Sequence, residues 1–549
     1  MKIFPARGRL ALAILTFVAA STAFAKDPRP NFLVIVADDL GFSDVGAFGG
    51  EIDTPNLDAL AYSGLRLTGF HSAPTCSPTR SMLMSGSDNH LAGLGSMAEL
   101  LAPNQKGHPG FEGYLRPDIA ALPERLHAAG YTTLMSGKWH LGTTPETDPS
   151  RRGFDYSFAL LQGGHNHFGL GLSTDPTKGG YTYRRNGTTL DALPADFYSS
   201  DAFTDELLHF FHESAGDGKP FFAYLAFTAP HWPMQAPAAD IAKYRGRYDA
   251  GFDELRNARL RRQGELGLLD PAVVAHTPVL KNGGWRDLSP EQRAEQARLM
   301  EIYAAMVDRL DRNVGRVVDY LKRTNQFDNT LILFMSDNGA EGVDLRAGTI
   351  PRMRQLVDAA DNRLDNLGTA TSYLGYGPGW AQAATAPSWL YKAYTTEGGT
   401  RVPAFVEYAG LKRQHAISNT FGTVADVLPT LIELAGAPPP TTAFEGRTVQ
   451  AVRGTSWVPY LVGNAERVHP PTEAVGWELF GARAVRTGDW KAVHLFDGDW
   501  QLFDIARDPG ETRDLSATEP KRLGRLVQEW DHYAKDVGVI LPSEAPYRP

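Results

Sequence analysis

Asn31-Phe32-Leu33-Val34-Ile35-Val36-Ala37 is the stretch of sequence that decides the fold. It is continuously apolar and rich in β-branched side chains, which is typical of a strand buried on both faces of a parallel sheet. It ends at two consecutive acidic residues, Asp38 and Asp39. The sequence therefore predicts a buried central strand with acidic groups at its carboxyl end.

The same alternation of apolar strands and amphipathic segments continues along the chain. We predict further strands over 131–135, 221–227 and 330–335, and helices over 54–61, 119–129 and 289–322. Strands that alternate with helices are typical of a mainly parallel or mixed sheet flanked by helices. The predicted fold class is therefore α/β, with one large sheet of this kind.

Polar residues follow each of these predicted strands. They are Asp38 and Asp39, Lys138 and His140, His231, and Asp337 and Asn338. In open α/β sheets, binding sites form at the carboxyl ends of the strands. We therefore expect these residues to meet at one edge of the sheet, although they lie far apart in the sequence.

The acidic members of this set indicate a hard divalent cation. Two carboxylates about 4 Å apart repel by roughly 4 kcal/mol at an effective dielectric constant near 20, so a cluster of three requires a cation or shifted pKa values. Oxygen ligands without clustered cysteine or histidine favour Ca²⁺ or Mg²⁺ over zinc. The alternative is that Asp38 and Asp39 form only a polar turn after the strand.

A second polar stretch surrounds the one cysteine of the chain. In Thr75-Cys76-Ser77-Pro78-Thr79-Arg80-Ser81 the proline favours the first turn of a helix. A helix start offers free N–H groups to an anion, and Arg80, about one turn further on, would face the same anion. The alternative is that Cys76 is a small buried hydrophobic residue. The polar surroundings favour the anion site.

The pattern Cys76-x-Pro78-x-Arg80 resembles the signature of type I sulfatases, and the segment Gly130-Tyr131-Thr132-Thr133-Leu134-Met135-Ser136-Gly137-Lys138-Trp139-His140 resembles their second signature. The resemblance runs from about residue 31 onward and is greatest to the calcium-dependent bacterial arylsulfatases. It implies an alkaline-phosphatase-like fold. It also implies that Cys76 is converted to formylglycine (3-oxoalanine) by a formylglycine-generating enzyme that acts on the unfolded chain.

The same resemblance assigns the other site residues. It implies one Ca²⁺ per chain, with Mg²⁺ left open. The implied metal ligands are Asp38, Asp39, Cys76, Asp337 and Asn338, and the implied catalytic residues are Cys76, Arg80, Lys138, His140, His231 and Lys392. The family usually has Glu-Gly-Gly closer behind its lysine than it stands behind Lys392, so Arg401 and Lys281 remain alternatives.

The mechanism implied by the resemblance has two steps. One hydroxyl of the Cys76-derived aldehyde hydrate attacks sulfur while Asp337 takes up a proton, and His231, with Lys392, protonates the leaving alcohol or phenol. The second hydroxyl then loses a proton to His140, which reforms the aldehyde and releases sulfate. The groups expected to hold the sulfuryl oxygens are Ca²⁺, Arg80, Lys138 and Lys392.

The first residues have the pattern of a secretory signal peptide. Lys2, Arg7 and Arg9 precede an apolar run over 10–20 and the cleavage pattern Ala23-Phe24-Ala25. We predict cleavage after this pattern and export to the periplasm; the alternative is an N-terminal core helix. The apolar run is too short to span a membrane, so we expect no membrane association after cleavage.

Charge and length bound the remaining possibilities. The 549 residues include 54 Lys plus Arg against 63 Asp plus Glu, for a net charge of −9. Such an acidic chain is a poor nucleic-acid binder, and a single cysteine excludes an intrachain disulfide.

We predict a signal peptide over 1–25, a catalytic domain over 26–440 and a C-terminal α+β subdomain over 441–549. Short strands over 484–493 and 501–504 give this subdomain an antiparallel sheet, and a helix over 521–535 closes it.

Two long stretches are predicted to be loops over the site, because long loops in compact domains are usually functional. They are 163–180, which contains His165 and His167, and 340–387. Asp308 and Asp311, on the long predicted helix, are interpreted as solvated or capping groups, since that helix carries an apolar core stripe.

The function predicted from these observations is hydrolysis of aryl sulfate monoesters. One alternative is a phosphomonoester or phosphonate monoester hydrolase, because related enzymes use similar metal and nucleophile geometry. The other is a non-catalytic protein that binds sulfated glycans and keeps Cys76 as a thiol. The expected partners are a small sulfate ester and the formylglycine-generating enzyme, with no nucleic acid.

Overall fold

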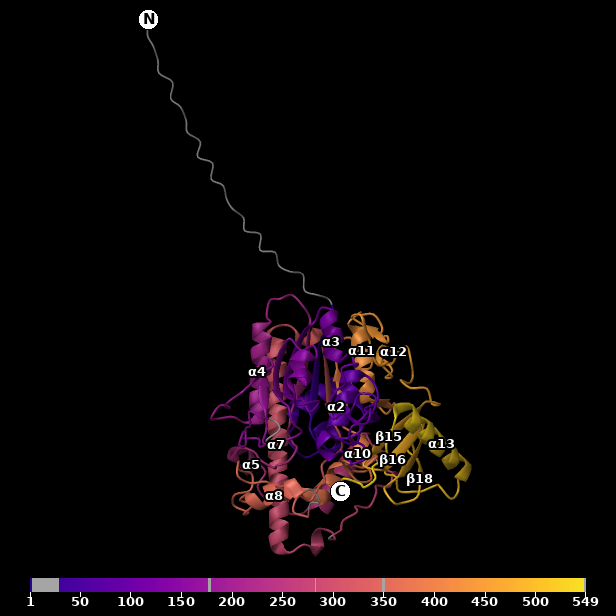
Figure 1. Ribbon diagram of the computed structural model, residues 1–549. Helices are drawn as coiled ribbons and strands as arrows, with labels where there is room; N and C mark the ends of the chain where they lie inside the picture. Colours follow the sequence, from indigo (N-terminus) through magenta and orange to yellow (C-terminus); the bar gives the residue numbers. More distant parts are fainter. Residues whose placement is uncertain (2–28, 176–178, 282, 348–350, 548–549) are drawn as a thin grey trace.

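The computed structural model describes residues 1, 29–175, 179–281, 283–347 and 351–547. Residues 2–25 of the predicted signal peptide lie outside the described residues, as do 176–178 of the first predicted loop and 348–350 of the second. Figure 1 shows a central sheet between two layers of helices, with a smaller sheet at one side.

The central sheet has ten strands in the order β11-β2-β10-β9-β1-β8-β4-β5-β6-β7. The block β9-β1-β8-β4-β5 is parallel, and antiparallel pairs lie on both sides of it. The strands span β1 Asn31–Ala37, β2 Leu65–Leu67, β4 Thr132–Lys138, β5 Tyr156–Leu160, β6 Tyr183–Arg185, β7 Thr188–Thr189, β8 Phe221–Ala226, β9 Thr330–Ser336, β10 Ala404–Glu407 and β11 Ala416–Ser418. The predicted α/β fold with a mixed, alkaline-phosphatase-like sheet is confirmed.

The strand β1 is buried along its whole length, between β8 and β9. Its side chains alternate between two separate cores: Leu33 and Ile35 pack in one, Val34 and Val36 in the other. This is the expected result for a continuous apolar run, because successive strand residues point to opposite faces and both faces are covered.

Helices cover both faces of the sheet (Figure 1). One face packs against α1 Pro55–Ser63, α4 Ser199–Glu213 and α7 Pro290–Arg323, and the other against α2 Cys76–Ser85, α3 Leu122–Ala128 and α11 Val427–Leu434. The remaining helices are α5 Ala238–Lys243, α6 Phe252–Glu265, α8 Pro351–Ala359, α9 Gly377–Ala384, α10 Glu397–Thr400, α12 Val458–Leu461 and α13 Pro520–Val537. Among the described residues, no helix has both the length and the apolar character needed to cross a bilayer.

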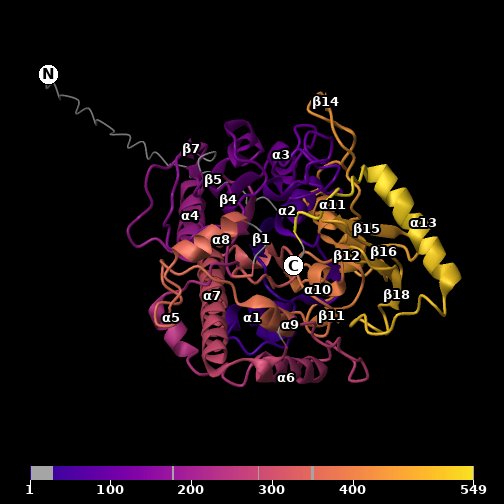
Figure 2. The ribbon, with the colours of Figure 1, turned by 60° about the horizontal axis from the view of Figure 1, so that its bottom comes forward.

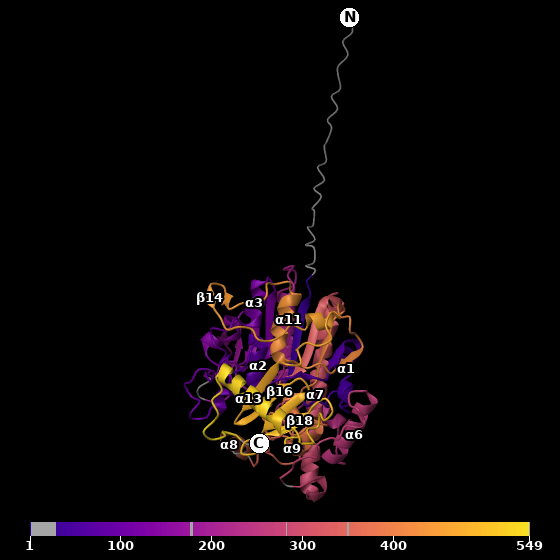
Figure 3. The ribbon, with the colours of Figure 1, turned by 90° about the vertical axis from the view of Figure 1, so that its right-hand side faces the viewer.

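The smaller sheet is antiparallel and lies in the C-terminal part of the chain. Its strands are β15 Ala474–Leu479, β16 Ala482–Thr487, β17 Trp490–His494 and β18 Gln501–Asp504. Leu526 and Trp530 of α13 pack on Val485, Ala492 and Leu502 of this sheet. Figure 3 shows α13 lying along this sheet from that side. The predicted C-terminal sheet and closing helix are confirmed, whereas the boundary at 440 stays a prediction. Two minor pairs complete the strands: β3 Phe70–His71 with β12 Gly422–Thr423, and β13 Ala443–Phe444 with β14 Arg447–Thr448.

Three details of the sequence interpretation were wrong. The strand expected to end at 135 continues to Lys138, so that this lysine belongs to β4. The stretch 340–387 was expected to be loop, but it contains α8 and α9. Asp308 is buried rather than solvated, because it pairs with Lys243 and Tyr244. The capping role of Asp311 is confirmed, since this residue accepts hydrogen bonds from the backbone N–H groups that begin α1.

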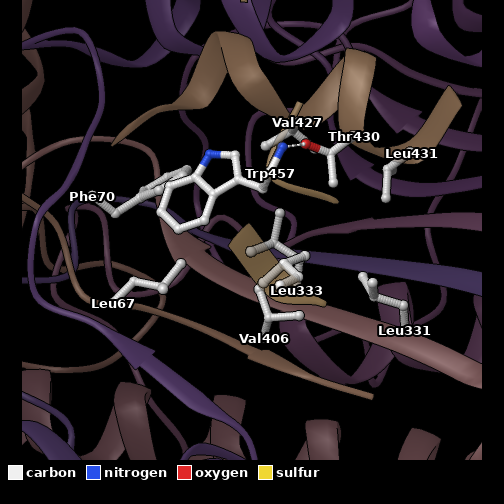
Figure 4. A pocket seen from close by; sticks show the side chains of 10 residues that line it. Leu67, Phe70, Leu331, Leu333, Val406, Val427, Thr430, Leu431 and Trp457 are labelled. Carbon is white, nitrogen blue, oxygen red and sulfur yellow. Dashed lines mark hydrogen bonds between the residues drawn. The ribbon is translucent and has the colours of Figure 1, made fainter. Parts of the chain in front are cut away.

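A small apolar cavity of about 30 Å³ remains beneath α11 (Figure 4). The nearest side chains include Leu67 of β2, Leu333 of β9, Val406 of β10 and Val427 of α11. Trp457 closes one side, and its backbone N–H donates to Thr430 Oγ1 at 2.8 Å. The cavity has no charged lining residue, so it is a packing defect of the core.

Candidate active site

The carboxyl ends of the central strands meet at one edge of the sheet. Asp38 and Asp39 directly follow β1, Asp337 follows β9, and Lys138 is the last residue of β4. His231 lies five residues beyond the end of β8. The structure thus brings together side chains that the sequence separates by up to about three hundred positions.

A buried acidic cluster forms the centre of this edge. Ligand atoms of Asp38, Asp39, Cys76 and Asp337 all lie within 4.8 Å of one another. The Sγ atom of Cys76 lies 3.5 Å from Asp38 Oδ1 and 3.8 Å from Asp39 Oδ1. Asn338 Nδ2 donates to Asp39 Oδ1 at 2.6 Å, while Asn338 Oδ1 is buried and has no hydrogen-bond partner among the described residues. The predicted ligand set is therefore contiguous in space.

This donor set fits a hard divalent cation. Three carboxylates and one unpartnered amide oxygen share a volume from which water is excluded, and no histidine belongs to the cluster. Burial, with Asp337 and Asp39 nearby, raises the pKa of Asp38 to about 8 even though Lys138 opposes the shift. Carboxylates packed in this way are costly to ionise alone and are well matched to Ca²⁺ or Mg²⁺.

Three cationic side chains surround the acids. Arg80 donates to Asp337 Oδ2 through Nη2 at 2.7 Å and through Nε at 3.0 Å. Lys138 Nζ lies 2.7 Å from Asp38 Oδ2, and Lys392 Nζ lies 2.8 Å from Asp39 Oδ1. Burial acts to raise the pKa of Asp337, but Arg80 and then Lys138 outweigh it and lower the pKa below its ordinary value.

The structure places Lys392, and neither of the alternatives, in this cluster. Arg401 stacks over the Phe42 ring at 4.2 Å and donates to Ser388, and Lys281 is exposed. Lys392 reaches the acids because its backbone N–H donates to Ala340 O, three residues after Asp337. The unusual spacing to Glu-Gly-Gly therefore did not displace this lysine from the site.

Cys76 occupies the first turn of α2. The helix begins at Cys76, and Thr75 in extended conformation precedes it. Cys76 is 1% exposed, and burial raises the pKa of its thiol well above the ordinary value despite Lys138 and Lys392. A thiol held in its protonated form is a weak nucleophile, so the unmodified side chain is poorly suited to attack an ester.

Two histidines lie beside the cluster. His231 Nε2 is 3.6 Å from Asp39 Oδ2, and its Nδ1 donates to Trp232 O at 2.6 Å. His140 Nε2 contacts Glu99 Oε1 at 3.0 Å, while His140 Nδ1 is buried without a hydrogen-bond partner in the described part of the chain. Burial lowers the pKa of both rings, with Lys392 adding to the effect on His231. Each ring therefore has one nitrogen held by the protein and one available to exchange a proton.

Part of the predicted loop over 163–180 lies against these histidines. His167 Nε2 donates to the backbone oxygen of His231 at 2.9 Å, and His167 Nδ1 accepts from Ser199 Oγ at 2.8 Å. A β-carbon added at Gly163 would collide with the His140 ring, so only glycine fits there. This part of the stretch supports the site histidines.

Sequence analysis missed two acidic residues of the site. Glu341 Oε2 pairs with Lys392 Nζ at 3.0 Å, and Glu99 holds His140. Glu341 lies shortly after Asp337-Asn338 in the sequence, and this proximity could have identified it as a site residue. Glu99 lies in a short 3₁₀ turn over Ala98–Leu100 and has no sequence pattern that would identify it.

Comparisons with known proteins show the family of this chain. The family described as Sulfatase matches residues 30–437. A Schizosaccharomyces pombe protein named an uncharacterized sulfatase is 49% identical over 534 residues, or 95% of this chain and 96% of that protein. An arylsulfatase of Klebsiella aerogenes is 37% identical over 432 residues, or 78% of this chain and 92% of that enzyme. The crystal structure of Ps i-CgsB in complex with k-i-k-neocarrahexaose aligns with a TM-score of 0.67 at 26% identity, over 94% of this chain and 95% of that chain.

Proposed function

The chain belongs to the sulfatase family of sulfuric ester hydrolases, and from this premise we propose that its substrates are aryl sulfate monoesters, which it cleaves to a phenol and inorganic sulfate. The observation that carries the proposal is the contact of Cys76 Sγ with Asp38 and Asp39, inside a ring of buried cations. The similarity to the Klebsiella arylsulfatase supports the aryl class.

We further propose that the acidic cluster holds one Ca²⁺. Its ligands would be Asp38, Asp39, Asp337, Asn338 and the side chain at position 76, as the shared volume and the unpartnered amide oxygen suggest. When bound, the ion would neutralise the carboxylates and act as a Lewis acid on a sulfuryl oxygen. The alternative is Mg²⁺, and analysis of the metal bound to the purified protein would distinguish the two ions.

Position 76 is proposed to carry formylglycine in the active protein. The buried, protonated thiol argues that the unmodified residue is not the nucleophile. The hydrated aldehyde would supply one hydroxyl for attack and a second for release of sulfate. Because Cys76 is 1% exposed, a formylglycine-generating enzyme would have to act before the chain folds.

The lysines are proposed to bind the sulfuryl oxygens. Each ammonium has three N–H donors. Lys138 approaches one carboxylate, that of Asp38, and Lys392 approaches Asp39 and Glu341. Both lysines lie among acids that keep them protonated. For Lys138, burial acts to lower the pKa, but the charge of Asp38 outweighs it and raises the pKa above its ordinary value. Preorganised cations of this kind stabilise charge that develops on an oxyanion.

Proton movements are assigned to the two histidines. Since His231 Nδ1 donates to a backbone carbonyl, Nε2 is the nitrogen that would exchange a proton with the departing oxygen. The corresponding nitrogen of His140 is Nδ1. Asp337 was predicted to accept a proton; its ion pair with Arg80 makes it a weaker base than its neighbour Asp38.

Parallel kinetics on 4-nitrophenyl sulfate and 4-nitrophenyl phosphate test the proposed function. We expect a higher kcat/KM on the sulfate for protein made with its modifying enzyme. A higher value on the phosphate would favour a phosphomonoester or phosphonate monoester hydrolase. An unmodified thiol at Cys76 in protein from the native host, with sulfated glycans bound but not cleaved, would favour the binding protein.

Export to the periplasm is also proposed, on the sequence pattern over 1–25 alone. Sequencing the first residues of protein recovered from the native host tests it. We expect the mature chain to begin at Lys26.

A further inference from the structure

The segment 161–167 contacts both histidines of the candidate active site. It directly follows β5, the strand beside β4 (Figure 2). The backbone N–H of His140 donates to Leu161 O at 3.2 Å, and His167 Nε2 donates to the backbone oxygen of His231 at 2.9 Å. The two ends of the segment therefore hold the backbone of two histidines that follow different strands, β4 and β8.

Two adjacent glycines in the middle of this segment lie against the two histidine rings. A β-carbon added at Gly163 would lie 2.4 Å from Cε1, 2.6 Å from Nε2 and 2.9 Å from Nδ1 of His140. A β-carbon added at Gly164 would lie 3.0 Å from Cε1 and 3.4 Å from Nδ1 of His231. Neither glycine has a positive φ. The narrow space beside the rings, rather than an unusual backbone conformation, therefore requires glycine at both positions.

Side chains on both flanks fix the position of this glycine pair. Gln162 Oε1 accepts from the backbone N–H of Thr182 at 2.8 Å, and Gln162 Nε2 donates to Thr182 Oγ1 at 3.3 Å. His165 is 2% exposed and contacts Thr228 Oγ1 through Nε2 at 2.9 Å and the Tyr183 hydroxyl through Nδ1. These contacts account for the burial of a histidine that takes no part in the proposed chemistry.

The orientation of the His140 ring depends on this packing. His140 Nε2 contacts Glu99, and Nδ1 has no hydrogen-bond partner among the described residues. A ring with a single hydrogen bond can turn about that contact unless its neighbours prevent it. The backbone at Gly163 lies beside three ring atoms, including both nitrogens, and so limits this turning. Displacing a reacting group by about 1 Å can lower a rate about 100-fold, so the ring position matters for proton transfer.

We propose that Gly163 and Gly164 are positioning residues, and that each serves a different step of the reaction through the histidine it contacts. The inference rests on the proposed function, because the two histidines transfer protons only in that mechanism. Gly164 would serve the first step through His231, and Gly163 would serve the second step through His140.

The two steps differ in the bonds that change. In the first, a hydroxyl oxygen on residue 76 bonds to sulfur as the bond from sulfur to the departing oxygen breaks. His231 Nε2 gives its proton to the departing oxygen, and a site carboxylate takes the proton of the attacking hydroxyl. In the second, His140 Nδ1 takes the proton of the remaining hydroxyl while the C=O bond forms and the C–O bond to sulfate breaks. Water then adds to the aldehyde and restores the hydrate.

Substrates with different leaving groups test the role of Gly164. Phenolate is a stronger base than 4-nitrophenolate and depends more on a proton from His231. In calcium-loaded protein made with its modifying enzyme, Gly164→Ala is expected to lower kcat/KM about 10-fold for phenyl sulfate and less than about 3-fold for 4-nitrophenyl sulfate. Equal losses for the two substrates, or no loss for either, would overturn the role of Gly164.

Pre-steady-state kinetics test the role of Gly163. Gly163→Ala is expected to lower kcat about 10-fold and leave kcat/KM unchanged, because sulfate release then limits turnover after 4-nitrophenol has left. Stopped-flow absorbance should show a burst of about one 4-nitrophenol per active site. Mass spectrometry of the quenched protein should find sulfate attached to residue 76. A lower kcat/KM without a burst, or unchanged kinetics, would count against this role.

Crowding of an unrelated ring provides the matched control. A β-carbon added at Gly379 would lie 2.6 Å from the Phe252 ring, a contact similar in length to that of Gly163 with His140. Gly379→Ala is expected to leave the ratio of the two kcat/KM values unchanged and to show no burst. The same kinetic pattern in this control would mean that general loss of packing, rather than histidine position, causes the effects.

Two further variants keep the inference testable if an added β-carbon prevents folding. Gln162→Ala and His165→Ala each release one flank of the glycine pair without adding an atom beside either ring. We expect a burst in Gln162→Ala and a larger loss for phenyl sulfate in His165→Ala. Normal kinetics in both would overturn the inference. Failure of the proposed function is seen separately, as absent hydrolysis of 4-nitrophenyl sulfate by the modified protein with an unaltered 161–167 segment.

Discussion

Arg80 and Asp337 form a fully buried ion pair in which both Nη2 and Nε of the guanidinium donate to one carboxylate oxygen, at 2.7 and 3.0 Å. Arg80 also donates to Lys138 O and Tyr224 OH. One side chain thus connects α2 to β4, β8 and the end of β9. This position explains why the Cys-x-Pro-x-Arg spacing matters. Arg80 holds the first turns of α2 against Asp337, and Cys76 in the same turns then faces Asp38 and Asp39.

Removing this arginine is expected to cost both stability and activity. Arg80→Ala leaves the Asp337 carboxylate buried without its partner, so the free energy of unfolding should fall by about 3–5 kcal/mol. Urea unfolding measures the loss. The control is Arg354→Ala, which breaks an exposed pair with Asp358 and should change stability little. Equal effects of the two variants would contradict the buried-pair interpretation.

Removing the metal is expected to destabilise the folded chain. A cation bound only by the folded cluster at 100 times its Kd stabilises by about 2.7 kcal/mol. Dialysis against chelator should therefore lower the Tm, and added Ca²⁺ should restore it more fully than Mg²⁺. Differential scanning calorimetry with verified metal content checks this. An Asp38→Asn variant should show a smaller response to chelation, and an identical response would place the ion elsewhere.

Glu99 is expected to act by holding His140. Glu99→Gln weakens the contact to Nε2, and the loss of a charged hydrogen bond corresponds to about a 10-fold decrease in kcat. Because the Glu99 charge opposes the burial that lowers the pKa of His140, its removal should also shift the acidic limb of the pH–rate profile to lower pH. The matched control is Glu112→Gln, on the same stretch of chain. A change in KM alone would argue against a role in proton transfer.

Filling the apolar cavity beneath α11 is expected to stabilise the protein. The volume of about 30 Å³ accommodates one additional methyl group, so Val406→Ile should raise the free energy of unfolding by up to about 0.8 kcal/mol. Val317→Ile, at a fully buried position of α7 that does not line the cavity, should instead destabilise by overpacking. Urea midpoints of the two variants should move in opposite directions.

A pH-dependent contribution to stability is expected from Glu511. Burial raises its pKa to about 7, against the opposing charge of Lys491. The folded state therefore binds this proton more tightly than the unfolded chain, whose carboxyl titrates near 4.5. The contribution is fully present below pH 4.5 and declines as the pH rises through about 7. Unfolding measured from pH 5 to 8 should show a smaller decline in Glu511→Gln than in the unaltered chain.

Much of the fold could be predicted because its signals are local. A short, β-branched apolar run such as 31–37 is typical of a strand buried on both faces, so both the strand and the acids after it could be predicted from the sequence. The long helix was equally clear, since its apolar positions recur at helical spacing. Positions at element ends were less certain: Lys138 lies within β4 because pairing with β5 and β8 continues past the apolar run.

What remained hidden depends on contacts between distant segments. Glu99 lies in a short 3₁₀ turn, and only the folded chain brings it to His140. The burial of Asp308 was missed for the same reason, since its partner Lys243 lies 65 residues away. No local pattern encodes such pairings.

The contacts that join the smaller sheet to the rest of the protein have a consequence for how the chain can be divided. Lys491 of β17 pairs with Glu397 of α10 at 2.8 Å, and Trp477 Nε1 donates to Ser72 O at 3.0 Å. Both partners are desolvated in the intact protein. Severing the polypeptide near residue 440 would expose these charges and the surrounding aromatic surface on each fragment. The two pieces would then be expected to aggregate or to require co-expression, and we expect the small sheet to unfold together with the rest of the chain.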